Sequence, residues 1–222
     1  MCIRDRISVI SLLLIAQPDI GQTLLVVFCW AALIFTSGIN IYILLAIFIA
    51  GASLLAYLII FVPKFDYIQG RIFSFFNRET GTHNFQSDKA IESITSGGFF
   101  GKGIGEGVLK NRVPEAHTDY IISVISEEFG VVAIMLILLL FLILIYMVFK
   151  KISFETNDKV KLILIGSISL ILMQATIHVG VNIRLFPTTG MTLPFLSYGG
   201  SSIISTSILG GIILNLTKRK IT

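Results

Sequence analysis

The segment PEAHTDY, Pro114–Tyr120, places a histidine and an aspartate directly before a long apolar stretch that begins at Ile121. Charged groups at the edge of a membrane segment are costly and tend to be functional. Asp119, together with Thr118, could cap the following helix, or it could act as a general base at the membrane surface. His117 could orient a hydrogen-bonding partner. Neither Asp119 nor His117 has a second ligand at zinc spacing, so we expect no zinc site.

A glycine-rich run, SGGFFGKGIGEG, precedes this segment at Ser96–Gly107. Its backbone can turn tightly, and successive N–H groups can form an anion-binding nest. It is not a P-loop, because the Gly-Lys-Ser/Thr element is missing. The simpler alternative is a turn packed against helix ends. The nearby cations Lys102, Lys110 and Arg112 favour an anionic ligand, and a diphosphate would match their charges.

Three polar residues recur at a spacing of four in a later apolar segment: Gln174, His178 and Asn182. This spacing puts them on one face of a helix. Because buried polar groups need partners, the face predicts either a polar groove or a hydrogen-bonded seam. Arg184 follows at the end of the segment, where its long side chain could reach the interface or bind phosphate.

The composition sets the class of protein. Of 222 residues, 55% are hydrophobic and 14% are charged, with mean hydropathy +0.89, whereas soluble domains carry about 25% charged residues. Apolar runs of about 20 residues can cross a membrane, so we predict an all-α, polytopic transmembrane helical bundle. The net charge of +4 then concerns topology, and no nucleic-acid partner is expected. The predicted segments are Ile7–Gln17, Ile20–Thr36, Ile39–Val62, Ile121–Phe149, Val160–Ile183 and Phe195–Leu216.

The basic residues predict the orientation, because lysine and arginine accumulate on the cytoplasmic side. They cluster before the first segment, between the fourth and fifth, and after the last. A single transmembrane domain over residues 1–222 therefore carries a long external loop at 63–118, and Arg184–Gly200 lies on the same external face. Short helices are expected in this loop at Tyr67–Asn77 and Ala90–Thr95. The shortened first segment, after MCIRDR, predicts an N-terminally truncated fragment.

Three stretches together resemble the SEDS family (FtsW/RodA): QPDIGQTLL, then SITSGGFFGKGIGEGVLKNRVPEAHTDYIISVISEEFG, then PTTGMTLPFLSYGGSS. Their order and spacing match, and the resemblance covers nearly everything after the first few residues. GEGVLK before PEAHTDY, and Thr192 in MTLPF, favour the division-type FtsW branch over RodA.

The resemblance implies an inverting peptidoglycan glycosyltransferase that polymerises lipid II during cell division. It would lie in the bacterial cytoplasmic membrane, surrounded by membrane lipids, and work with a class B penicillin-binding protein and other divisome proteins. Family members have ten transmembrane helices, of which this chain would supply about the last six. A lipid II flippase or a non-catalytic scaffold is the alternative.

The family's essential aspartate corresponds to Asp119, the expected general base. Mg²⁺ or Mn²⁺ is the candidate metal, because both prefer oxygen ligands and phosphate. The residues expected to bind substrate are Lys102, Lys110, Arg112, Glu115, His117, Gln174, His178, Asn182, Arg184 and Ser197.

Overall fold

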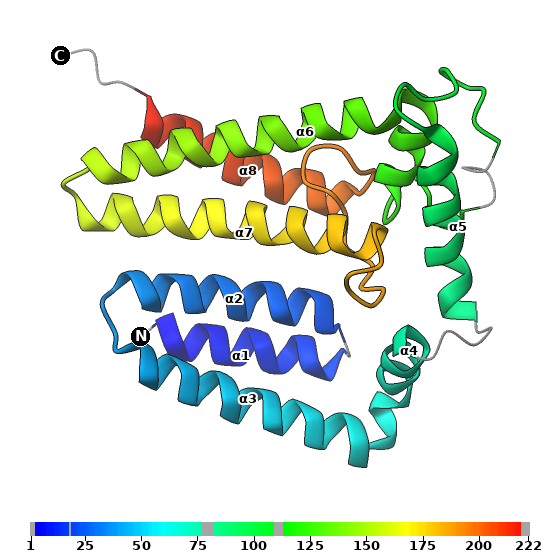
Figure 1. Cartoon of the computed structure of the whole chain (residues 1–222). Helices are drawn as coiled ribbons and strands as arrows, with labels where there is room; N and C mark the ends of the chain where they lie inside the picture. The colour runs from blue at the N-terminus through cyan, green and yellow to red at the C-terminus, as the bar shows by residue number, and fades with distance from the viewer. Residues whose placement is uncertain (1–2, 18, 77–81, 109–112, 219–222) are drawn as a thin grey trace. The chain divides into compact units, whose positions relative to one another are not determined.

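The structure, a computed structural model, describes residues 3–17, 19–76, 82–108 and 113–218. These residues form helices and no strand (Figure 1). The chain divides into two compact units, residues 1–79 and 80–222; the single domain predicted over the whole chain stays a prediction. The helices are α1 (Ile3–Ala16), α2 (Ile20–Thr36), α3 (Ile41–Phe61), the 3₁₀ helix η1 (Pro63–Phe65), α4 (Asp66–Phe76), α5 (Thr82–Gly97), α6 (Ile121–Phe154), α7 (Asp158–Asn182) and α8 (Gly200–Thr217).

The first unit contains α1 to α4. Asp19 begins α2, because its Oδ1 accepts the N–H of Gln22 at 3.0 Å. Asn40 begins α3 in the same way, accepting the N–H of Tyr42 at 3.0 Å. Such side chains satisfy backbone N–H groups that have no partner inside the helix. No residue of α3 is buried, and a helix that is apolar on all sides yet exposed suits a membrane span.

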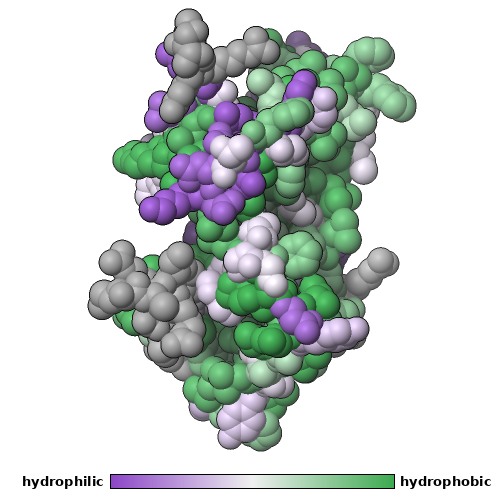
Figure 2. Space-filling view, turned by 90° about the vertical axis from the view of Figure 1, so that its left-hand side faces the viewer, coloured by the Kyte–Doolittle hydropathy of each residue, from purple (hydrophilic) through white to green (hydrophobic). Residues whose placement is uncertain are grey.

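The second unit contains α5 to α8. α6 and α7 lie along one another, and α5 crosses the end at which α6 begins and α7 finishes (Figure 1). We call this end, marked by Ile121 and Asn182, the α5 end. The opposite end, near Lys150 and Lys151, is the lysine end, and hydrophilic side chains gather there over the turn between α6 and α7 (Figure 2). One buried apolar cluster lies toward the lysine end and consists of Val148, Leu164, Ile168, Ile171 and Ile213, and a second consists of Ile122, Ala175 and Leu193.

All six predicted apolar segments are helices, and the chain is a polytopic helical membrane protein. Among the described residues, α3, α6, α7 and α8 are long and apolar enough to cross a membrane, and α2 is a shorter apolar helix. The predicted start of the last segment at Phe195 is wrong, since α8 begins at Gly200. Phe195 has a φ of 65°, which is incompatible with a regular helix at this position. Ser197 Oγ accepts the N–H of Leu193 at 2.8 Å and closes a turn before α8.

The loop between α3 and α6 is largely helical. The short helix predicted from Tyr67 is α4, and its predicted last residue, Asn77, lies outside the described residues. The turn or two of helix predicted at Ala90–Thr95 is confirmed, but α5 is longer, from Thr82 to Gly97. Its pairing with α6 stabilises the additional turns.

α6 is broken at Gly130, whose φ of 79° and ψ of −178° belong to a region that essentially only glycine occupies. A break leaves the last carbonyls of the first half without helical partners. The glycine-rich run supplies them: the N–H of Lys102 donates to Glu127 O at 2.8 Å, and the N–H of Gly103 donates to Glu128 O at 3.1 Å.

The same run also satisfies the start of the second half. The N–H of Val131 donates to Gly98 O at 3.0 Å, and the N–H of Val132 donates to Phe99 O at 3.3 Å. Non-helical backbone at membrane depth is tolerated where such partners are supplied. The run therefore holds both halves of α6, and the first half, 121–129, carries Asp119 just before its start.

Candidate active site

Asp119 lies in a tight turn built around one carbonyl. Glu115 has a φ of 55°, and its carbonyl oxygen accepts the N–H groups of Thr118, Asp119 and Tyr120 at 3.2, 3.1 and 3.3 Å. The Thr118 hydroxyl donates to the same oxygen at 3.1 Å and to Glu115 Oε2 at 3.0 Å. The N-cap of α6 is Tyr120, so neither Thr118 nor Asp119 occupies the capping position that the sequence allowed.

Two other segments meet Asp119. Asn182, fully buried at the end of α7, donates from Nδ2 to the Asp119 carbonyl at 3.0 Å and to His178 O at 2.9 Å. Gly190, in the loop between α7 and α8, faces the carboxylate: a Cβ there would lie 3.5 Å from Asp119 Oδ2. The turn before α6, the end of α7 and this loop thus converge on one carboxylate at the α5 end.

The remaining polar residues of the α7 face bind the same loop. His178 Nδ1 lies 2.7 Å from Met191 O. Gln174 Nε2 donates to the carbonyl and the hydroxyl of Thr192 at 3.0 and 3.2 Å, and to Ser202 Oγ at 3.2 Å. Of the two interpretations left open by the sequence, the described contacts form a hydrogen-bonded seam.

This seam keeps unused hydrogen-bonding capacity. Among the described residues, His178 Nε2, Asn182 Oδ1 and Thr189 Oγ1 are buried and have no hydrogen-bond partner. Because His178 Nδ1 meets a carbonyl oxygen, it carries the proton, and Nε2 of a neutral ring is then an acceptor. Buried polar atoms without partners are costly. Because these atoms have almost no exposed surface, the partner that suits them is an ordered water. The sequence did not single out Thr189. The one feature of the sequence that could have indicated it is its position next to Gly190.

Arg184 is paired with a residue that the sequence did not single out. Its guanidinium donates to the carboxylate of Asp88 on α5. Arg184 has a φ of 59°, and the N–H of Leu185 reaches back to Gly180 O at 2.7 Å. This left-handed residue ends α7 and turns the Arg184 side chain toward α5. The Asp88 side chain is 54% exposed, so the ion pair lies at the surface of the second unit.

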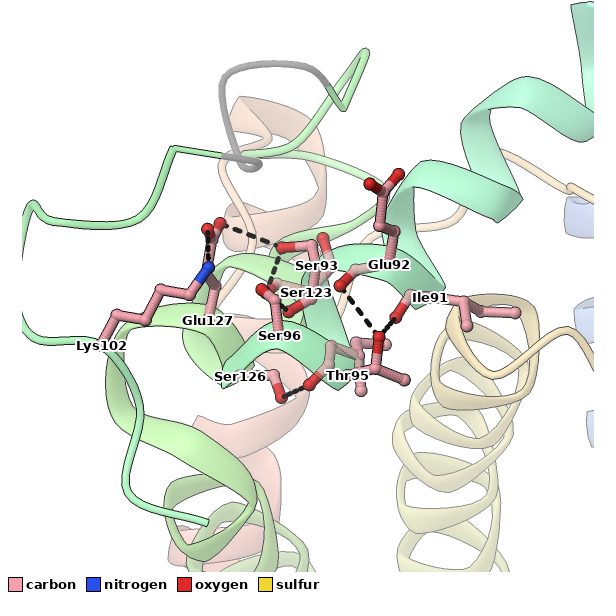
Figure 3. Close-up of polar contacts among 10 residues, drawn as sticks. Ile91, Glu92, Ser93, Thr95, Ser96, Lys102, Ser123, Ser126 and Glu127 are labelled. Carbon is pink, nitrogen blue, oxygen red and sulfur yellow. Dashed lines mark hydrogen bonds and ion pairs between the residues drawn. The ribbon is translucent and has the colours of Figure 1, made fainter. Parts of the chain in front are cut away.

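Lys102 also has a partner within the chain. Its Nζ lies 3.5 Å from Oε1 of Glu127, whose side chain is fully buried. Glu127 Oε2 accepts the Ser93 hydroxyl of α5 at 3.1 Å, and Ser93 also lies 3.2 Å from Ser123 O. Figure 3 shows this group of contacts where α5 meets the first half of α6. Lys102 therefore neutralises a buried carboxylate in addition to its expected role toward substrate.

The glycine-rich run forms a turn packed against helix ends, which is the simpler of the two structures that the sequence allowed. Cβ atoms built at Gly97 and Gly101 would lie 1.9 and 2.2 Å from the carbonyl oxygens of Ser126 and Glu128, so only glycine permits this approach. One N–H of the run does bind an anion, since Gly105 donates to Glu128 Oε1 at 3.2 Å. That anion belongs to the chain itself.

The other predicted residues have different surroundings. The His117 carbonyl accepts the N–H of Tyr198 at 3.0 Å, and the His117 side chain is exposed. Ser197 is buried and closes the turn before α8. Lys110 and Arg112 lie outside the described residues.

The described residues contain no group of three or more His, Cys, Asp or Glu side chains that could hold a metal ion. Asp119 alone could supply one carboxylate, which matches magnesium bound mainly through phosphates and water. The residues do not form a complete protein site, so no step below uses a metal, and Mg²⁺ or Mn²⁺ stays a prediction.

The helical bundle defines a multi-pass membrane protein in which three segments of the second unit meet at one carboxylate, Asp119. The sequence matches the family described as "Cell cycle protein" (FtsW/RodA/SpoVE) over residues 3–221. The chain belongs to the FtsW/RodA/SpoVE family.

Its relatives and one solved structure are consistent with that membership. The chain is 36% identical to the "Probable peptidoglycan glycosyltransferase FtsW" of Caulobacter vibrioides, over 94% of this chain and 52% of that protein. It is 33% identical to the protein of the same name in Enterococcus hirae, over 96% of this chain and 57% of that protein. The chain thus spans about half the length of these curated relatives. A solved structure described as "Structural coordination of polymerization and crosslinking by a peptidoglycan synthase complex" matches with a TM-score of 0.75 and 27% identity, over 96% of this chain and 60% of that one.

Proposed function

We propose that this chain carries the catalytic face of a peptidoglycan glycosyltransferase that polymerises lipid II, with Asp119 as the general base. The proposal rests on the position of Asp119. Its backbone is held by Asn182 and its carboxylate faces Gly190, so the turn before α6, the end of α7 and the loop before α8 meet at this carboxylate. The relatives are named as probable peptidoglycan glycosyltransferases, and these names support the same activity.

In the proposed reaction, Asp119 accepts the proton of an acceptor sugar hydroxyl. The resulting oxygen nucleophile forms a bond to the anomeric carbon of the donor, and the bond from that carbon to the lipid-linked diphosphate breaks. The diphosphate leaves with the bonding electron pair, so no general acid is required. A single displacement with one base inverts the anomeric configuration. A positioned base of this kind contributes about 10²–10⁴-fold.

The departing diphosphate needs positive charge, and Arg184, which follows Asn182 by two residues, is our candidate. In its pair with Asp88, the Asp88 side chain is 54% exposed and the Arg184 side chain is 22% exposed, and ion pairs near the surface contribute only about 0–1 kcal/mol. Exchanging Asp88 for a diphosphate therefore costs little, and a planar guanidinium can bind two phosphate oxygens at once. Lys102 would have to leave a fully buried carboxylate, which costs more.

The distribution of polar groups in the second unit favours a polymerase over a flippase. The side-chain hydrogen bonds of the α7 seam run from Asn182 to Gln174, and toward the lysine end the buried residues of α7 are Leu164, Ser167, Ile168 and Ile171, of which only Ser167 is polar. A transporter would need polar groups that continue to the other leaflet.

The test is polymerisation of lipid II by the reconstituted protein carrying Asp119→Asn, with glycan strands measured on gels. The matched control is Glu106→Gln, which removes an exposed carboxylate from the same loop. We expect a loss of about 10²-fold or more for Asp119→Asn and little change for the control. The contact with Asn182 is through the Asp119 backbone, so Asp119→Asn keeps that contact, and a Tm measured beside turnover separates lost activity from lost folding. Unchanged polymerisation by Asp119→Asn would overturn the proposal.

We also propose that the protein lies in the bacterial cytoplasmic membrane, with the α5 end external, and works beside a class B penicillin-binding protein. The lysine-rich turn between α6 and α7 supports this orientation. The similar solved structure is a peptidoglycan synthase complex, which supports such a partner. The partnership is tested by co-purification of a penicillin-binding protein with the wild type and with Asp119→Asn. We expect it with both, and its absence with the wild type would refute the partnership.

A further inference from the structure

The glycine-rich run presents large apolar side chains that no part of the described chain covers. Phe99, Phe100 and Ile104 are 75%, 84% and 78% exposed. In a loop that faces water, three such exposed side chains within six residues would promote aggregation. Their backbone is not loose, because it is hydrogen-bonded to both halves of α6.

Those hydrogen bonds set the depth of the run relative to the membrane. A hydrocarbon core of roughly 30 Å takes about 20 helical residues. Counting this length back along α6 from Lys150, at the lysine end, reaches Gly130. Gly98 and Phe99 are bonded to Val131 and Val132, so the run lies at the level where the hydrocarbon core ends.

Exposed apolar side chains also lie on α6 around the break. Phe129, Val132 and Met135 are exposed on the helix at and below the break, at 45%, 51% and 62%. The second half of α6 is the most apolar of the candidate spans. Exposed rings and aliphatic chains at the core boundary have the character of interfacial anchors.

We propose that Phe99, Phe100 and Ile104 insert into the leaflet at the α5 end, at the boundary between headgroups and acyl chains. The occupant of this surface is therefore lipid. The anchor fixes the height of the run that holds the first half of α6, and with it the turn that carries Asp119. This inference depends on the membrane orientation of α6 and not on the glycosyl-transfer chemistry.

The proposal can be tested by depth-dependent quenching in nanodiscs. Native cysteines are removed (Cys2→Ser, Cys29→Ala), and Phe100→Cys is labelled with an environment-sensitive fluorophore. Glu106→Cys, exposed in the same loop, is the matched control, and Leu139→Cys, exposed in the middle of α6, is the deep reference. Quenchers are lipids with a nitroxide near the carbonyl end or the methyl end of the acyl chain, and aqueous iodide.

We expect the label at position 100 to be quenched by the shallow nitroxide about twofold or more above position 106, and to be correspondingly protected from iodide. The deep nitroxide should favour position 139. Ile104→Cys, which leaves both phenylalanines intact, should repeat the result. Equal iodide quenching at 100 and 106 would overturn the proposal. So would protection from iodide without nitroxide quenching, because a protein would then cover the surface.

Discussion

The break in α6 makes one substitution especially informative, Gly130→Ala. Gly130 combines a φ of 79° with a ψ of −178°, and a Cβ there would lie 2.2 Å from Phe99 O. Alanine therefore meets both backbone strain and a carbonyl that cannot rotate away, because Phe99 O accepts the N–H of Val132. Relief requires the glycine-rich run to separate from α6.

The two costs can be estimated separately. Holding alanine in this conformation costs about 1–3 kcal/mol. Losing the hydrogen bonds at Val131 and Val132 costs about 1–3 kcal/mol together. The total is about 2–6 kcal/mol, which corresponds to a fall in Tm on the order of 10 °C for a chain of this size. Because the run also positions the turn before α6, polymerisation should fall with stability.

Thermal unfolding of the purified protein in micelles, followed by intrinsic fluorescence, measures the effect. Gly105→Ala is the matched control: Gly105 has a φ of 83° but nothing within 4 Å of its Cβ position, so only strain of about 1–2 kcal/mol is expected. Gly211→Ala, in open space on α8, should be neutral or gain up to about 1 kcal/mol. If Gly130→Ala loses no more Tm than Gly105→Ala, the run does not hold the broken helix.

Further expectations concern the site and one exposed ion pair. Gly190→Ala should lower stability by about 1–2 kcal/mol because of its φ of 68°, and it should also lower polymerisation, because the added methyl would lie in contact, 3.5 Å, with Oδ2 of the candidate base and take up space beside it; unchanged turnover at a lowered Tm would contradict this. Arg184→Ala should lower turnover more than Lys110→Ala, since Arg184 follows the polar face of α7, and equal turnover of the two variants would count against it. The hydrogen bond from Lys151 lowers the pKa of the Glu155 carboxyl. That pair stabilises the folded state above the ordinary glutamate pKa of 4.5 and loses its effect as pH falls below it. Glu155→Gln should therefore slightly flatten the acid side of a plot of Tm against pH; an unchanged slope would show that the pair contributes nothing.

Helix positions followed from the sequence because hydrocarbon length and apolar run length match directly. Asn182 and His178 were also singled out from their spacing, which puts them on one helix face whatever packs against it. The start of α8 was misplaced because a serine, Ser197, closes a turn inside an apolar stretch. Hydropathy does not register a side-chain hydrogen bond of that kind.

Pairing across long separations was beyond sequence reasoning. Arg184 and Asp88 are 96 positions apart, and neither carries a local signal for the other. The break at Gly130 was equally hidden, since a glycine after SEEF in a long apolar pattern is compatible with a continuous helix. Its cause lies in the run around Gly98, which reaches α6 only in the folded chain.

From its sequence alone, this protein was determined to be a membrane-spanning helical chain of a recognisable family with a candidate carboxylate at position 119. Those properties depend on amino-acid composition, on the spacing of apolar residues and on short motifs, all of which can be read directly from the sequence. Only the tertiary structure decided that α6 is two half-helices joined by a glycine-rich run, and that three separate segments converge on Asp119. Such features arise from hydrogen bonds between backbone groups far apart in the sequence, and the order of residue types does not specify which of these groups pair.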